Sequence, residues 1–140
     1  MDDELVRIAA HNNALWCDAI CRSHGIAGEF EATAWTSAHR TPPLYPDAVT
    51  LGPQVAAGDI LARIDRETPG ASIKDSFARL DLADAGFRVL FEAQWIFRPA
   101  DRPPPAAPEQ PWSRVNSPED LAAAVRHGCL PIGGLKIWLA

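Results

Sequence analysis

Apolar and polar side chains alternate along residues 86–99. The odd positions from 89 to 97 are all apolar, whereas the charged side chains of this stretch all stand at even positions. A helix would spread the odd positions around its circumference, because every second residue turns by about 200°. The pattern therefore predicts a long, half-buried strand, which we expect to be the central strand of a sheet.

Residues 4–24 instead follow a helical period. Asn12 stands in the middle of an apolar arc about 140° wide, with Trp16 one turn later on the same arc. We expect both side chains to be buried, either lining a ligand pocket or packed in the core with the amide bonded to a loop. The apolar residues of this arc are Leu5, Ile8, Ala9, Leu15, Trp16, Ala19 and Ile20.

Shorter patterns fill the middle of the chain. Three prolines in residues 41–46 predict an extended, polyproline-like segment. A short strand is expected over residues 48–51, a helix over residues 54–66, and a strand over residues 72–80. Tyr45 and Asp47 follow the prolines, where they either shape the lip of a cleft or serve the turn.

The strand at residues 72–80 is expected to form a hairpin with the long strand. Like charges directly opposite each other are unfavourable, and this selects the register in which Ile73 shares a face with Trp95. In that register Asp75 falls on the apolar face. Lys74 falls on the polar face, near Glu92 or Gln94.

Six of the 13 prolines lie between positions 99 and 111, which marks a linker. We therefore expect an α-β-α-β-β domain over residues 1–98, a linker over residues 99–111, and the β-α start of a second unit over residues 112–140. In that second unit a strand is expected at residues 112–115 and a helix from Ser117 to about His127. Residues 135–139 are expected to form an exposed edge strand, open to self-association or to a partner protein.

The net charge of −5 argues against a nucleic-acid partner, which a basic patch would normally bind, and leaves small molecules or proteins. No apolar run approaches the length of a membrane span, and the chain opens with acidic residues rather than with a signal peptide. We accordingly expect a cytoplasmic protein with reduced thiols.

Cys17, Cys21 and His24 share one edge of the first helix. No second ligand cluster accompanies them, so we interpret them as structural and expect no metal site.

Several stretches together resemble the N-terminal half of bacterial proteins of the GNAT superfamily of N-acetyltransferases. They are residues 12–25, 40–51, 72–78 and 86–96, and the resemblance covers about residues 5–127. It implies an α/β fold of the α+β type, with a mostly antiparallel mixed sheet and flanking helices, and we expect the helices to pack on one face of the sheet. It also implies acetyl transfer from acetyl-CoA to an amine.

The chain departs from that superfamily at its diagnostic motif. A glycine-rich loop that opens a helix normally holds the pyrophosphate of CoA. Here the glycines of residues 127–134 surround Pro131, with no helical pattern behind them. We therefore expect the non-catalytic N-terminal half of an acetyltransferase-like protein. The alternative is a small binding module that associates with itself through an edge strand.

Six residues are candidates for a site. Burial of Asp75 would disfavour its ionised form, as suits a general base, and Glu92 is the second candidate catalytic carboxylate. The structural alternatives are an Asp75 paired with the backbone or a lysine, and an exposed Glu92 paired with Lys74. Candidate ligand-binding residues are Asn12, Trp16, Lys74 and Trp95.

Overall fold

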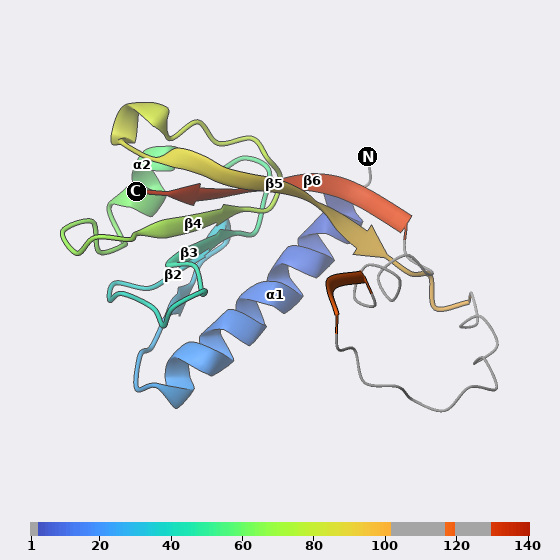
Figure 1. Ribbon diagram of the computed structural model, residues 1–140, viewed down its shortest axis with the longest axis horizontal. Coiled ribbons are helices and arrows are strands. Elements are labelled where there is room, and N and C mark those ends of the chain that lie inside the picture. Colours follow the sequence, from blue (N-terminus) through green and yellow to red (C-terminus); the bar gives the residue numbers. More distant parts are fainter. Residues whose placement is uncertain (1–2, 102–116, 120–129) are drawn as a thin grey trace. The chain divides into compact units, whose positions relative to one another are not determined.

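A computed structural model describes residues 3–101, 117–119 and 130–140 of the chain (Figure 1). Residues 1–95 and 132–140 form one compact unit, and residues 96–131 form a second unit, most of which lies outside the described residues. The elements are α1 (Asp3–Ser23), β1 (Glu29–Phe30), β2 (Ala34–Thr36), β3 (Ala48–Thr50), α2 (Ala57–Leu61), β4 (Ser72–Asp75), the 3-10 turn η1 (Ala83–Ala85), β5 (Arg88–Phe97) and β6 (Leu130–Leu139).

The strands form one mixed sheet in the order β1-β2-β3-β4-β6-β5. Strands β3 and β4 are parallel, whereas β1 with β2, β2 with β3, and β4 with β6 are antiparallel. Parallel neighbours require a crossover connection, and the segment that joins β3 to β4 contains α2. The chain thus has the expected α+β fold with a mostly antiparallel sheet.

The expected order of the strands is wrong at three points. The long strand β5 lies at an edge of the sheet rather than at its centre. It forms no hairpin with β4, because β6 lies between them. Residues 135–139 are therefore part of an interior strand, and Ile132–Ala140 completes the sheet of the first unit instead of belonging to a second one. The expected strand at residues 112–115 and most of the expected helix after Ser117 lie outside the described residues.

Each face of the sheet has its own hydrophobic cluster, because neighbouring strand residues point to opposite faces. Ala48 of β3 packs in a cluster with Ile60 and Ile64, whereas Val49 packs in a cluster with residues of α1. The two helices thus cover opposite faces, and the expectation that they share one face is wrong. Of these helices, neither combines the length and the apolar character needed to cross a bilayer.

Helix α1 has the predicted extent but buries the opposite face. Its buried residues are centred about 160° away from the predicted apolar arc. Ile8, Leu15 and Trp16 of that arc are 59%, 49% and 59% exposed. Small side chains allow the helix to lie close to the sheet, and the buried set is Val6, Ala10, Ala14, Cys17, Asp18 and Cys21.

Candidate functional site

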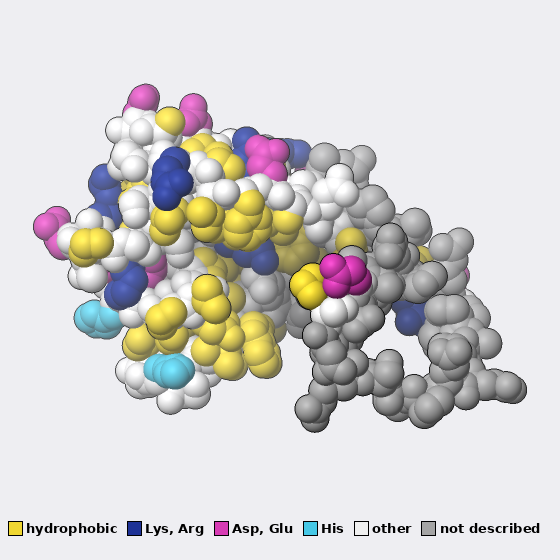
Figure 2. All heavy atoms as spheres, viewed as in Figure 1, with side chains coloured by type: hydrophobic (Ala, Val, Ile, Leu, Met, Phe, Trp, Pro, Cys, Tyr) yellow, Lys and Arg dark blue, Asp and Glu magenta, His cyan; other side chains and the backbone are white. Residues whose placement is uncertain are grey.

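A cavity of about 620 Å³ lies on the α1 side of the sheet. Its floor consists of alternate residues of β4 and β6, which the register places directly opposite each other: Ser72 with Leu139, and Lys74 with Ile137. In the space-filling view, hydrophobic side chains gather on both sides of a hollow in this face (Figure 2). The remaining lining residues are Asn13, Trp16, Cys17, Arg40, Thr41, Pro42, Pro43, Leu44, Tyr45, Pro46, Gly70, Leu90 and Phe91.

Residues 40–46 form one wall, which we call the loop wall. The segment is not extended as predicted, because the Tyr45 N–H donates to the Pro42 carbonyl at 3.1 Å and closes a turn. Leu44 occupies this turn with a φ of 74°, a conformation that normally favours glycine or asparagine. The Leu44 side chain is fully exposed at the lip of the cavity.

A buried carboxylate holds the loop wall in place. Asp47 is completely buried, and its Oδ1 accepts the Thr41 N–H at 3.0 Å. Its Oδ2 accepts the Ser72 N–H at 2.9 Å and forms an ion pair with Arg40. Arg40 also donates to the carbonyl oxygens of Asp65 and Thr68. The loop is thus tied to β4 at one end and to the segment before β4 at the other.

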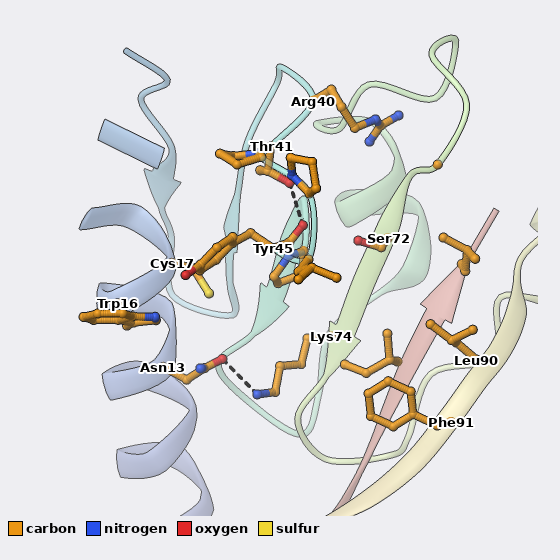
Figure 3. Close-up of a pocket in the computed structure, with 17 residues that line it drawn as sticks. Asn13, Trp16, Cys17, Arg40, Thr41, Tyr45, Ser72, Lys74, Leu90 and Phe91 are labelled. Carbon is orange, nitrogen blue, oxygen red and sulfur yellow. Dashed lines mark hydrogen bonds between the residues drawn. The ribbon is translucent and has the colours of Figure 1, made fainter. Parts of the chain in front are cut away.

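Leu90 and Phe91 of β5 form the facing wall, which we call the strand wall (Figure 3). They are 48% and 53% exposed. The strand wall therefore offers apolar surface to a ligand while contributing little to the core of the protein.

Lys74 rises from the floor toward α1, between these walls (Figure 3). Its Nζ donates to Asn13 Oδ1 at 3.0 Å and lies 4.4 Å from the centroid of the Trp95 ring, the geometry of a cation–π contact. Trp95 is itself fixed by a 2.9 Å hydrogen bond from its Nε1 to the Ser76 carbonyl. Burial lowers the pKa of Lys74, and burial raises the pKa of the Cys17 thiol to about 11, so that this thiol is neutral at pH 7.

The structure brings together three of the four predicted ligand-binding residues. Trp16 and Lys74 line the cavity, and Trp95 supports the ammonium of Lys74. Asn12 is exposed on the outer side of α1, so its predicted burial is wrong, and its neighbour Asn13 faces the cavity instead. The predicted contact of Lys74 with Glu92 or Gln94 is also wrong, because β4 does not pair with β5.

Neither candidate catalytic carboxylate lines the cavity. Asp75 is buried as predicted, and its two oxygens accept the backbone N–H groups of Phe77 at 3.3 Å and Leu80 at 2.8 Å. This arrangement stabilises the turn that follows β4. Glu92 is exposed and lies 3.6 Å from Lys136, which takes the place expected for Lys74.

The edge of α1 that carries Cys17 and Cys21 is buried against the sheet, whereas His24 is exposed. Within the described part of the chain, no group of three His, Cys, Asp or Glu side chains is placed to hold a metal ion. Both thiols are buried, as is usual for cysteine in a protein core, and Cys17 also lines the cavity.

Sequence reasoning missed the floor residues of β6 because it placed the tail in another unit. It also left Tyr45 and Asp47 open between a cleft lip and a turn, and both interpretations hold: Tyr45 lines the cavity and Asp47 anchors the turn.

In comparisons with protein-family models, curated proteins and solved structures, the chain matched none.

Proposed function

We propose that this chain is a binding module for a small, mainly apolar molecule, which occupies the cavity between the loop wall and the strand wall. The observation that carries the proposal is the cavity itself. Its volume of about 620 Å³ is within the range typical of ligand sites, and aromatic and aliphatic side chains surround a few polar groups.

The proposal agrees with the resemblance to acetyltransferase-like proteins, in which this chain would correspond to a non-catalytic half. Acetyl transfer is supported less well by the geometry, since Asp75 is occupied with backbone N–H groups and Glu92 is on the exposed side of an edge strand. Acetyl-CoA remains a ligand to test. At 100 times its dissociation constant it would raise the free energy of unfolding by about 2.7 kcal/mol, which a thermal shift detects.

The test uses N-phenyl-1-naphthylamine, a neutral aromatic probe whose fluorescence rises in apolar surroundings. We expect saturable binding to the folded chain with a stoichiometry of one. Trp16→Ala and Phe91→Ala should each weaken binding several-fold, because each removes an aromatic side chain from the cavity.

Two matched controls distinguish the cavity from apolar surface in general. Ile8 is as exposed as Trp16 on the same helix, and Ile96 is as exposed as Phe91 on the same strand, but neither lines the cavity. Ile8→Ala and Ile96→Ala should therefore leave probe binding unchanged. Equal losses in controls and cavity variants, or no saturable binding, would contradict the proposal.

A second candidate function is self-association through β5. This strand of 10 residues is the outermost of the described sheet beside β6, and it exposes Val89, Leu90, Phe91 and Ile96. A long apolar edge strand is a template for pairing with a second copy. Light scattering coupled to gel filtration would show a concentration-dependent dimer that Ile96→Lys disrupts, and a monomer at all concentrations would rule this candidate out.

A further inference from the structure

Lys74 is a partly buried cation on the floor of the cavity, and its contacts with Asn13 and Trp95 involve no negative charge. Among the described residues, no carboxylate forms an ion pair with Lys74 and no Asp or Glu lines the cavity. The other cation of the lining, Arg40, is already neutralised by Asp47 and bonded to two carbonyl oxygens. The neutral thiol of Cys17 supplies no compensating charge.

A partly buried ammonium without a counter-ion is costly to maintain. Here the amide oxygen of Asn13 and the face of the Trp95 ring stabilise the ammonium in place without neutralising it. An ammonium has three N–H donors, and the bond to Asn13 uses one of them. The floor of the cavity thus presents a fixed positive charge surrounded by apolar walls, with N–H donors for which the described residues show no further acceptor.

Resting on the proposed function, we infer that the cavity selects an organic anion: an apolar, ring-bearing molecule whose single anionic group, such as a carboxylate or sulfonate, binds Lys74. The apolar body contacts the loop wall and the strand wall. The anionic group accepts hydrogen bonds from the ammonium and supplies the missing counter-charge. A neutral molecule of the same shape fills the same space without compensating the charge.

The test compares 1-anilinonaphthalene-8-sulfonate with N-phenyl-1-naphthylamine, which is the same molecule without the sulfonate. We expect the sulfonate to bind about tenfold more tightly to the unchanged chain, as charge-assisted hydrogen bonds imply. Lys74→Met should weaken the sulfonate about tenfold and leave the neutral probe within twofold. Lys74→Arg should retain the preference for the anion.

A second variant tests the charge of Lys74 by giving its ammonium a counter-ion within the protein. Asn13→Asp keeps the shape of the side chain that bonds Lys74 and gives the ammonium an internal carboxylate. It should therefore abolish the preference for the sulfonate, even if Lys74→Met does not fold. Lys136→Met removes a strand lysine outside the cavity and should change neither affinity. Circular dichroism verifies that each variant is folded.

The outcomes separate this inference from the proposed function. If the neutral probe binds in the cavity but the sulfonate binds no more tightly, the inference is overturned while the proposed function stands. The same holds if Lys136→Met weakens the sulfonate as much as Lys74→Met does, or if Asn13→Asp leaves the preference unchanged. If neither probe binds in the cavity, both are overturned.

Discussion

The loop wall and the strand wall of the cavity are held in place in opposite ways. The loop wall has no regular secondary structure, yet a buried carboxylate ties it to β4 through an ion pair and backbone hydrogen bonds. The strand wall belongs to a strand of 10 residues, yet its side chains are about half exposed at the edge of the sheet.

This difference shows that regular secondary structure is a poor guide to how many tertiary contacts hold each wall. Substitutions behind the loop wall should act on stability, because buried polar groups without partners are costly. Substitutions on the strand wall should act on ligand affinity, because the side chains there have little protein contact to lose. Lys74 lies between the walls, and substitutions there should change ligand affinity through the loss of its positive charge.

The largest effect is expected for Asp47→Asn. The amide keeps the shape of the carboxylate but leaves Arg40 without its counter-ion and brings two N–H donors against existing donors. Removing one partner of a buried charge pair costs about 3–5 kcal/mol, so we expect the free energy of unfolding to fall by about 3 kcal/mol. Urea denaturation measures the change.

Asp84→Asn, an exposed position in η1, serves as the matched control and should shift the free energy of unfolding by less than about 0.5 kcal/mol. Equal stability of the two variants would mean that Asp47 does not anchor the loop wall.

The pH dependence of sulfonate binding examines the charge between the walls. Burial lowers the pKa of Lys74 from its usual 10.5, so the ammonium loses its proton at a lower pH than a free lysine does. Affinity for the sulfonate should therefore fall as the pH rises through that lowered pKa, by about tenfold in all. Affinity for the neutral probe should stay constant, and Lys74→Met should abolish the pH dependence.

Affinity is a better measure here than stability, because two nearby groups act on stability with opposite signs. The unfolded chain holds the proton of Lys74 more strongly, so this lysine makes stability rise with pH between its lowered pKa and 10.5. The folded chain holds the proton of Cys17 more strongly, so this thiol makes stability fall between pH 9.0 and about 11. Tyr45 and Arg40 also line the cavity, and the difference between the two probes isolates Lys74 from them.

Local sequence patterns predict where the strands and helices lie better than they predict which strands lie side by side. The period-two pattern located β5 and the helical period located α1, because each depends on residues close in the chain. The same pattern says which side chains share a face but not which strand lies alongside. The insertion of β6 between β4 and β5 brings together residues more than 60 positions apart, which alternation within each strand cannot reveal.

The site was predicted in part for a related reason. Sequence reasoning places Lys74 and Trp95 at a site through a pairing between β4 and β5 that does not exist. Both nevertheless lie at the cavity, because β6 joins β4 and β5 into one continuous sheet. Sequence reasoning does not identify the buried face of α1, because the size of the apolar side chains matters less here than how closely the helix packs against the sheet. The helix buries Ala10 and Ala14 and leaves Ile8 outside, which hydropathy alone does not anticipate.

On the strand wall, Phe91→Ala should cost less than about 1 kcal/mol of stability while weakening probe binding, since the ring is 53% exposed. Ile96→Ala, at 61% exposure on the same strand, should cost a similar amount. A loss above about 2 kcal/mol for Phe91→Ala would place its ring in a packed core and remove the contrast between the walls.

The smallest effect is expected at the lip of the loop wall. Leu44 is held at a φ of 74° with its side chain fully exposed, so glycine would relieve backbone strain without loss of packing. Part of that gain is offset by the greater freedom of glycine in the unfolded chain, and we expect Leu44→Gly to stabilise the protein by about 0.5 kcal/mol.

Leu44→Ala is the control, because it keeps the backbone strain and should leave the stability unchanged. Both variants should weaken probe binding to the same extent, because both remove the side chain that lines the cavity. If Leu44→Gly instead destabilised the protein, the backbone of the turn would not be strained at Leu44. The hydrogen bonds of Asp47 would then not be holding the loop wall in a strained conformation.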